Sequence, residues 1–376
     1  MLRVKDNWSA EAERVDLSTF LNPYSVTMRF SVIIPLFNRP QEIDELLESL
    51  THQTYQEFEV LVVEDGSTER AEAIVEKYSD RLDVTYFFKE NSRQGFTRNF
   101  GFERAKGDWL VVFDSDCLIP SHYFQSVVDF LVDHPDTDVY GGPDAAAAEF
   151  SDLQKAISYS MTSPLTTGGI RGNKRNVGVY HPRSFNMGIS RKAWETTGGY
   201  RISVKGEDVE FSIRILEHGL KTALITDAFV YHKRRTSFSQ FRSQVQFFGR
   251  ARVNIRKFYP GELKPLHWMP ALFLLYCTSI LPVWLTMGGI VSPGYRALSV
   301  CMAYTAPFII WSLALLLHAM LRTKSLRIAL LALRAGFIQL TSYGWGLLDE
   351  YVRVVLFKLH DPTIGEIREV PRPQKH

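Results

Sequence analysis

The fold of this chain is decided by three segments, FSVIIPLFNRP (30–40), FEVLVVEDGS (58–67) and WLVVFDSD (109–116). Each begins with a run of mostly apolar, often β-branched residues and ends in polar residues that favour a turn. A short, nearly continuous apolar run is typical of a strand that is buried on both faces, as in a parallel sheet. The segments therefore predict three buried strands with polar residues at their carboxyl ends.

Helical patterns separate these strands. Apolar residues recur at helical spacing from 43 to 50, and further helices are expected at 68–78, at 97–106 and from about 121. One more strand is expected at 84–88. Alternating strands and helices imply right-handed crossovers. The sequence thus predicts an α/β fold in which helices cover both faces of a mostly parallel sheet.

The ligand site of such a sheet lies beyond the carboxyl ends of its strands. The candidate residues at those ends are Pro35, Phe37, Asn38, Asp65, Asp114 and Asp116. Farther along, residues 160–185 are rich in Gly, Ser, Thr and basic residues, which indicates a long loop of the kind that often covers or binds a ligand. A helix is expected from 206 to 218, with Gly219 at its end.

Composition excludes several classes of protein. The 376 residues are 45% hydrophobic and 22% charged, which argues against a disordered chain. The net charge is +2 and no groove-reading motif is present, so no nucleic-acid partner is expected. Three scattered cysteines suit a reducing compartment rather than a disulfide framework. Residues 1–29 are mixed and contain no apolar run, so we expect an N-terminal extension without a signal peptide.

The last third of the chain has the composition of membrane helices. Spans are expected at 268–291 and 297–321, because each run is apolar and long enough to cross a bilayer. Basic residues flank the outer ends of this hairpin, namely Arg250, Arg252, Arg256, Lys257, Lys264, Arg322, Lys324 and Arg327. By the positive-inside rule both ends, and the sheet domain with them, lie in the cytosol.

Two neighbouring segments are harder to assign. Residues 328–348 are apolar but contain Arg334 and Gln339, so a third span, a re-entrant element and an interfacial helix all stay open. Aromatic residues and arginines alternate through 238–258, within a linking segment at 236–266. That pattern predicts a helix along the membrane interface with its apolar side in lipid.

Asp114 and Asp116 follow a buried strand and can converge on one hard cation, Mg²⁺ or Mn²⁺, whose remaining ligands would be diphosphate oxygens. A solvated acidic turn is the alternative. His232 lies beside Lys233-Arg234-Arg235, a cluster that fits a diphosphate or metal site as well as it fits anionic lipid.

Asp208 opens the helix at 206–218, where it could accept the proton of an attacking hydroxyl. Acidic residues also simply favour a helix N-terminus. Asp65 could bind a nucleobase or start a turn, and Phe37 could stack on a base or fill the core.

Five segments in this order resemble glycosyltransferase family 2, whose domain has the GT-A fold. They are VIIPLFNRPQEI (32–43), VLVVEDGS (60–67), GFTRNFGFERAKGDWLVVFDSDC (95–117), FNMGISRKAW (185–194) and GGYRISVKGEDVEFSIRILEHG (198–219). The resemblance implies a nucleotide-sugar donor, most often UDP-linked, with Pro35–Asn38 and Asp65 at the base and Arg98 and Asn99 lining the nucleotide site. It further implies Asp114 near the ribose and diphosphate, Asp116 on the metal and Asp208 as catalytic base.

The resemblance thus predicts a membrane-anchored, inverting, metal-dependent transferase. Its catalytic domain would span 30–235, its membrane region 267–350 and its C-terminal tail 351–376. The acceptor would be a hydroxyl of a lipid-linked molecule or a glycan at the cytosolic face of the inner membrane, as in cell-envelope polysaccharide synthesis. The alternative is a polyprenyl-phosphate glycosyl synthase. The Gln-x-x-Arg-Trp element of processive synthases is absent, because Gln246–Arg250 lacks the tryptophan.

Overall fold

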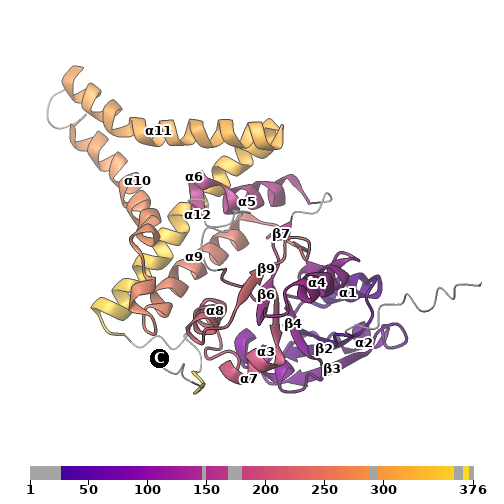
Figure 1. Cartoon of the computed structure of the whole chain (residues 1–376). Helices are drawn as coiled ribbons and strands as arrows, with labels where there is room; N and C mark the ends of the chain where they lie inside the picture. The colour runs from indigo at the N-terminus through magenta and orange to yellow at the C-terminus, as the bar shows by residue number, and fades with distance from the viewer. Residues whose placement is uncertain (1–26, 146–149, 168–179, 288–294, 360–366, 372–376) are drawn as a thin grey trace, which may run out of the picture.

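A seven-stranded sheet in the order β3-β2-β1-β4-β8-β6-β9 forms the centre of the computed structural model (Figure 1). The structure describes residues 27–145, 150–167, 180–287, 295–359 and 367–371. The strands are β1 (Phe30–Leu36), β2 (Phe58–Asp65), β3 (Val84–Lys89), β4 (Trp109–Phe113), β6 (Val139–Gly141), β8 (Asn186–Ser190) and β9 (Thr222–Leu224). β1 pairs in parallel with both β2 and β4, whereas β8 runs antiparallel to its neighbours β4 and β6. The expected parallel sheet is confirmed, with one reversed strand inserted in it.

Helices cover both faces of this sheet, as predicted. On one face α1 (Pro40–Thr51) and α4 (Tyr123–Asp133) pack their apolar residues against β1 and β2. On the other face α3 (Arg93–Phe102), α7 (Arg191–Thr197) and α8 (Glu207–Glu217) pack against β4 and β8. α8 has the expected bounds within one residue, and Gly219 follows it with a φ of 71°.

Two helices differ from the predicted bounds. α2 is only Glu72–Glu76, and the segment before it is tied to the end of β1, where Asn38 accepts hydrogen bonds from the backbone N–H groups of Thr68 and Glu69. α3 begins four residues before the expected start and ends four before the expected end. Beyond it, Glu59 accepts a hydrogen bond from the N–H of Lys106, which ties that segment to the sheet.

A small second sheet, in the order β5-β10-β7, lies beside the carboxyl ends of the main strands. β5 (Cys117–Leu118) pairs antiparallel with β10 (Val230–His232), and β7 (Asp144–Ala145) pairs with β10 in parallel. This register places His232 opposite Cys117, directly after Asp116. The small sheet therefore carries His232 to the end of β4.

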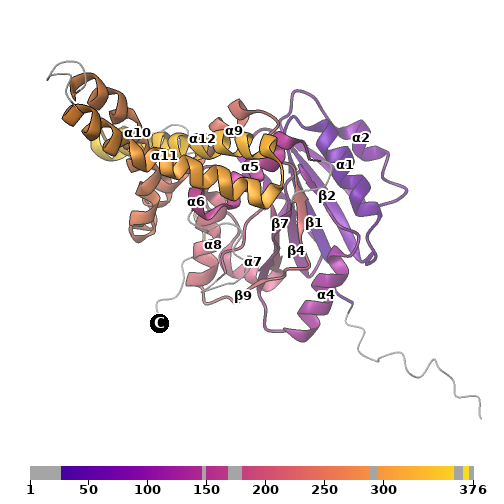
Figure 2. The same cartoon turned by 90° about the horizontal axis from the view of Figure 1, so that it is seen from above.

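A helical layer stands against this α/β unit (Figures 1 and 2). Its centre is α12 (Leu326–Tyr351), which packs against α5 (Asp152–Thr162), α9 (Phe238–Ile255), α10 (Met269–Leu285) and α11 (Tyr295–Thr323). At the α9–α12 crossing a Cβ on Gly346 would lie 2.2 Å from the carbonyl oxygen of Gln246. Only a residue without a side chain permits this approach. α6 (Pro164–Thr167) joins the same layer, because the indole of Trp311 donates to the carbonyl of Leu165 at 3.0 Å.

This packing corrects the interpretation of 238–258. The apolar side of α9 is not in lipid: Phe241 and Val245 are fully buried and form one cluster with Ile157, Met161 and Ala335 of α5 and α12. The amphipathic pattern was real, but its apolar face is covered by protein. α12, whose nature the sequence left open, is buried along one side by the same contacts, with Ala329, Ala332 and Ala335 inaccessible.

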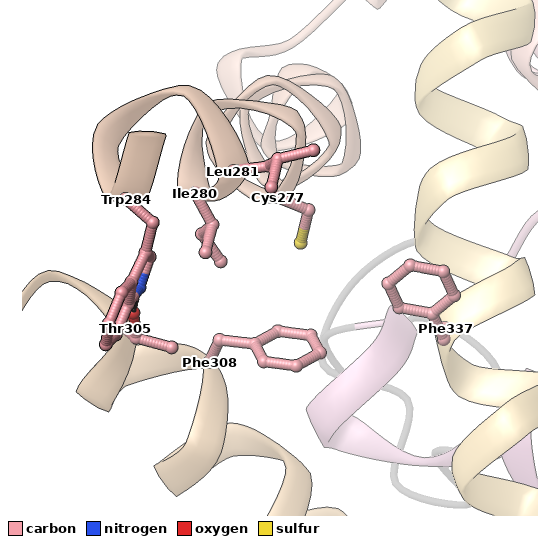
Figure 3. Close-up of a pocket in the computed structure, with 7 residues that line it drawn as sticks. All are labelled: Cys277, Ile280, Leu281, Trp284, Thr305, Phe308 and Phe337. Atoms are coloured by element: carbon pink, nitrogen blue, oxygen red, sulfur yellow. Dashed lines mark hydrogen bonds between the residues drawn. The ribbon is translucent and has the colours of Figure 1, made fainter. Parts of the chain in front are cut away.

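α10 and α11 are different, because their large apolar side chains are exposed. Leu281, Leu285, Ile310 and Leu321 are each more than 60% exposed. In the part of the chain that the structure describes, two helical segments are long and apolar enough to cross a membrane, Pro265–Leu285 and Ala297–Thr323. Figure 1 shows the end of α10 close to the start of α11, and the two helices farther apart where each approaches α12. Between them and Phe337 of α12 lies a pocket of about 440 Å³, whose lining carries no charged side chain (Figure 3).

Candidate active site

The ends of β1 and β2 form one connected loop unit. The N–H of Asn38 donates to the hydroxyl of Ser67 at 2.8 Å, and the Asn38 side-chain oxygen accepts from the N–H of Thr68 at 2.9 Å. Asn38 adopts a φ of 51°, which turns the chain sharply out of the sheet. Pro35 is the penultimate residue of β1. Phe37 is 48% exposed and so is not a core residue, which leaves its ring face free for stacking.

Asp65, at the end of β2, is buried and joins three segments. Its carboxylate accepts a hydrogen bond from the N–H of Ser92 at 2.8 Å and pairs with Lys89 of β3. Its carbonyl accepts from the Asn91 side chain at 2.7 Å. These contacts hold the start of α3 against the end of β2, so Asp65 does more than begin a turn.

Arg98, in α3, connects two acidic motifs that are far apart in sequence. Its guanidinium donates to Asp114 at 2.8 Å and to Glu207 at 3.2 Å. Burial alone would lower the pKa of Arg98, but the neighbouring Tyr200, Asp114 and Glu207 hold the pKa above its ordinary value. The buried cation therefore fixes the end of β4 relative to the start of α8.

Asn99 is held differently. It donates to the carbonyl of Tyr200 at 2.8 Å and accepts from the N–H of the same residue at 2.7 Å. This double hydrogen bond fixes the segment before α8 to α3. The role of Asn99 at the nucleotide stays a prediction. Within the chain, its hydrogen bonds position the backbone at Tyr200.

Asp116 is surrounded by cations. Its carboxylate accepts from Arg39 at 2.6 Å, from the His232 Nε2 at 3.0 Å and from Arg235 at 3.5 Å, and its side chain is 8% exposed. Burial would raise the pKa of Asp116, but the His232 hydrogen bond and the charges of His232, Arg39 and Arg235 outweigh it and hold the pKa below its ordinary value. Asp116 is thus a carboxylate in a strongly positive environment.

The same place has the donor atoms of a metal site. Among the described residues, ligand atoms of Asp116, Cys117 and His232 lie within 4.8 Å of one another. Burial raises the pKa of the Cys117 thiol, which points to the carbonyl of Phe185 at 3.6 Å and so stays protonated. A carboxylate and an imidazole fit Mn²⁺ or Mg²⁺ better than a thiol does. Of the three predicted metal ligands, Asp116 and His232 are brought together, whereas Asp114 pairs with Arg98 instead.

Asp208, in the first turn of α8, is the accessible member of an acidic pair. Its side chain is 31% exposed and that of Glu207 only 4%. Desolvation would raise the pKa of Asp208, but Arg183, at 3.2 Å, and Arg98 lower it. For Glu207, burial and the Asp208 charge raise the pKa. Asp208 is therefore the ionised carboxylate that an incoming group can reach.

The sequence did not single out Arg39, Arg183 or Glu207 as site residues. Arg39 directly follows Asn38 at a strand end, so its position carried a signal that could have been used. Arg183 lies in the loop at 160–185, where no periodicity indicates the direction of a side chain. Glu207 was visible beside Asp208, but only the fold shows that it binds Arg98. The arrangement gathers cationic side chains around Asp116, the donor atoms of a potential metal site and an accessible carboxylate at Asp208.

Comparison with known proteins identifies the α/β unit. Residues 31–198 match the family model described as glycosyl transferase family 2. A glycosyltransferase of Haemophilus influenzae is 28% identical over 223 residues, which are 57% of this chain and 73% of that protein. The poly(ribitol-phosphate) β-N-acetylglucosaminyltransferase TarS of Staphylococcus aureus is 37% identical over 111 residues, which are 28% of this chain and 19% of TarS.

Among solved structures, the mannosyltransferase PcManGT of Pyrobaculum calidifontis, in complex with GDP-Man and Mn²⁺, has the same fold. Its TM-score is 0.55 with 18% identity, over 85% of this chain and 92% of that one.

Proposed function

The chain belongs to glycosyltransferase family 2 through the domain at residues 31–198, and we propose that it transfers a sugar, with inversion, from a nucleotide sugar to an acceptor hydroxyl with the help of a divalent cation. The observation that carries this proposal is the position of Arg98. It contacts both Asp114 of the strand-end motif and Glu207, the neighbour of Asp208. This contact supports a single site that contains the strand-end acidic motif and the proposed base, rather than two unrelated acidic turns.

The donor would lie across the carboxyl ends of the strands. Phe37 would stack on the nucleobase and Asp65 would accept from it, while Pro35 and Asn38 shape that turn. Arg39 and Arg235, both about 30% exposed beside Asp116, would bind the diphosphate. A uridine donor is the first choice by family resemblance. The complex of PcManGT with GDP-Man makes a guanosine donor the second.

Asp116 and His232 would hold Mn²⁺ or Mg²⁺, with Asp114 facing the diphosphate and ribose. The bound cation would neutralise the negative charge that develops on the leaving diphosphate. Arg39 and Arg235 add fixed positive charge in the same place, and they need no reorganisation when the bond breaks. These residues therefore stabilise the leaving group.

Asp208 would accept the proton of the acceptor hydroxyl. Because its pKa is lowered, Asp208 is ionised at neutral pH and ready to accept that proton as the hydroxyl attacks the anomeric carbon. Attack from the face opposite the diphosphate gives inversion in one step. Arg183 holds the carboxylate in position at 3.2 Å.

The acceptor would reach this site at a membrane. The exposed apolar surfaces of α10 and α11 support a protein that crosses a membrane more than once. The basic residues that flank these helices favour the inner membrane with the catalytic domain in the cytosol. The proposed catalytic domain is 30–235, although α5 and α6 within it pack against the membrane-region helices. A polyprenyl-phosphate glycosyl synthase stays the second candidate, since a lipid phosphate could occupy the place of the hydroxyl.

The test is release of nucleoside diphosphate by the full chain in membranes from a panel of UDP-, GDP- and dTDP-sugars, with Mn²⁺ and with chelator. We expect metal-dependent release from one donor and its loss in Asp116→Ala. Asp136→Ala, at an exposed carboxylate paired with Lys221, is the matched control and should release normally. Release that is indifferent to chelator and to Asp116→Ala would contradict the metal assignment.

A further inference from the structure

The C-terminal segment 367–371 returns to the α/β unit and pairs with its backbone. Ile367 forms an antiparallel β-bridge with Ile202. The N–H of Arg368 donates to the carbonyl of Arg201 at 2.8 Å. Ile367 itself is 55% exposed, so backbone pairing rather than burial of this side chain holds the segment. The tail therefore lies along the stretch of chain that runs from α7 into α8.

Two side-chain contacts fasten the same segment. The guanidinium of Arg368 donates at 3.0 Å to Glu103, which directly follows α3. Gly198 ends α7, and a Cβ on it would lie only 2.7 Å from the ring of Pro371, so the tail packs against this end of α7 (Figure 1). The tail thus contacts α3, α7 and the backbone between α7 and α8, which gives it a defined position.

The stretch between α7 and α8 determines where α8 begins. Arg214, in α8, donates to the carbonyl of Gly199 at 2.6 Å. The carbonyl of Ser203 accepts from the N–H of Gly95, in α3, at 2.8 Å. Asp208 is the second residue of α8. A displacement of this stretch would therefore reach the proposed base within a few residues.

This stretch lies between α3 and the tail. On one side a Cβ on Gly95 would lie 2.3 Å from the carbonyl oxygen of Ile202, which leaves no space between α3 and the backbone. On the other side Ile202 pairs with Ile367. α3 also carries Arg98, which contacts Glu207 at the start of α8. The tail therefore completes the support of a stretch that α3 and α8 hold from the inside.

We propose that Ile367 and Arg368 are positioning residues for the base, because the docked tail holds the stretch before α8 and with it Asp208. This inference rests on the proposed transferase function and adds to it residues that lie outside the family domain at 31–198. A base must stand in place when the acceptor hydroxyl attacks, and a misplacement of about 1 Å can slow a reaction 10²-fold. Because the tail follows the helical layer in the chain, it connects the proposed membrane region to the base.

The first test compares the full chain with two shortened variants, one ending at Glu366 and one ending at Pro371. The shorter variant lacks the docked segment, whereas the longer one keeps it and is the matched control. For the shorter variant we expect the rate of nucleoside-diphosphate release at saturating donor to fall about five- to tenfold. The dissociation constant of the nucleoside diphosphate, with Mn²⁺ present, should stay at the wild-type value. The control should match the wild type in both measurements.

An exchange of charges tests the contact of the tail with α3. Arg368→Glu and Glu103→Arg should each lower the rate about two- to threefold, a small effect because both side chains are about half exposed. The double variant Arg368→Glu/Glu103→Arg restores opposite charges and should recover the wild-type rate. A purely destabilising effect of the single substitutions would not be reversed in this way. A double variant as slow as the single variants would overturn the role of Arg368.

Amide hydrogen exchange tests the positioning without the reaction. In the variant ending at Glu366, the amides of residues 200–210 should exchange faster than in the wild type and the control, while those of β1 and β2 should not change. Equal exchange at 200–210, an unchanged rate of release, or a parallel loss of nucleotide affinity would each overturn the inference. If the wild type releases nucleoside diphosphate from no donor, the proposed function fails, whereas the exchange still decides whether the tail holds the start of α8.

Discussion

Asp116 and Asp208 are both carboxylates paired with arginine, but they are placed by different parts of the molecule. Asp116 follows β4 and is 8% exposed, and its partners come from the end of β1 and from the region of β10. Asp208 opens a helix, is 31% exposed and pairs with Arg183 from a loop. The residues just before it are held by α9, which in turn packs on α12. The proposed donor half of the site therefore depends on the sheet, whereas the proposed acceptor half depends on the helical layer.

This difference has a functional consequence. A rigid sheet edge suits a nucleotide, which is the same in every turnover and needs a preformed cationic site. The acceptor half is assembled from helices that reach into the proposed membrane region. The acceptor site can therefore be matched to a lipid-anchored substrate without change at the strand ends. Substitutions in the two halves should therefore affect donor binding and sugar transfer separately.

The largest effect is expected for Asp208→Asn. Loss of a general base slows transfer by about 10²–10⁴-fold, while donor binding stays at the wild-type level. Initial rates of transfer and the dissociation constant of the nucleotide are the two measurements. Glu217→Gln, at the other end of α8, is the control and should be fully active. A loss below about fivefold would instead indicate a lipid phosphate as nucleophile.

Arg98→Gln should affect both halves together. Removing one partner of a buried ion pair costs about 3–5 kcal/mol, because the buried Glu207 is left without its cation. We expect a lower free energy of unfolding and a loss of both donor binding and transfer. Urea denaturation followed by fluorescence measures the free energy of unfolding, and titration of the nucleotide in parallel measures donor binding. Arg104→Gln, exposed just after the same helix, should be neutral; equal effects of the two variants would refute the bridging role.

Arg39→Gln should weaken the donor half alone. The guanidinium is about 30% exposed and one of two arginines at Asp116, so we expect nucleoside-diphosphate affinity to fall about tenfold. Binding of acceptor analogues should not change. Titration calorimetry with the nucleoside diphosphate, in the presence of Mn²⁺, measures this affinity. An unchanged affinity would mean that Arg39 serves only to pair with Asp116.

Asn254→Ala should produce the smallest effect, and only in the acceptor half. It leaves the carbonyl of Lys205 without its hydrogen bond and loosens α9 from the start of α8. We expect kcat to fall severalfold with an unchanged dissociation constant of the donor. Ser243→Ala, exposed on the same helix, is the control. A change in donor affinity instead of kcat would show that α9 supports the sheet rather than the base.

The sequence predicted the donor half better than the acceptor half, for a physical reason. Continuous apolar runs specify buried parallel strands, and the topology of such a sheet brings Asp65, Asp114 and Asp116 to one edge. Asp208 could be found because a helix start and an acidic pair are visible locally. The pairing of Arg98 with Glu207 could not be predicted, because it joins residues that are 109 positions apart in the sequence.

The helical layer was the part predicted least well. The pattern of α9 identified its apolar face, but a pattern does not say whether lipid or protein covers that face. In the structure Phe241 and Val245 are buried by α5 and α12 rather than by a bilayer. Gln339, which interrupts the apolar pattern of α12, is buried among these helices. α10 and α11 differ from α12 because their apolar side chains are exposed, and hydrophobicity alone does not distinguish the three helices.

The most direct test of this account is titration of the nucleoside diphosphate, with Mn²⁺ present, into the wild type, Asp116→Asn and Asp208→Asn. Because different elements position the two carboxylates, we expect Asp208→Asn to bind the nucleotide as the wild type does, although it no longer transfers sugar. Asp116→Asn should lose at least about tenfold in affinity, together with its dependence on Mn²⁺. Equal loss in both variants would show a single indivisible site and contradict the account.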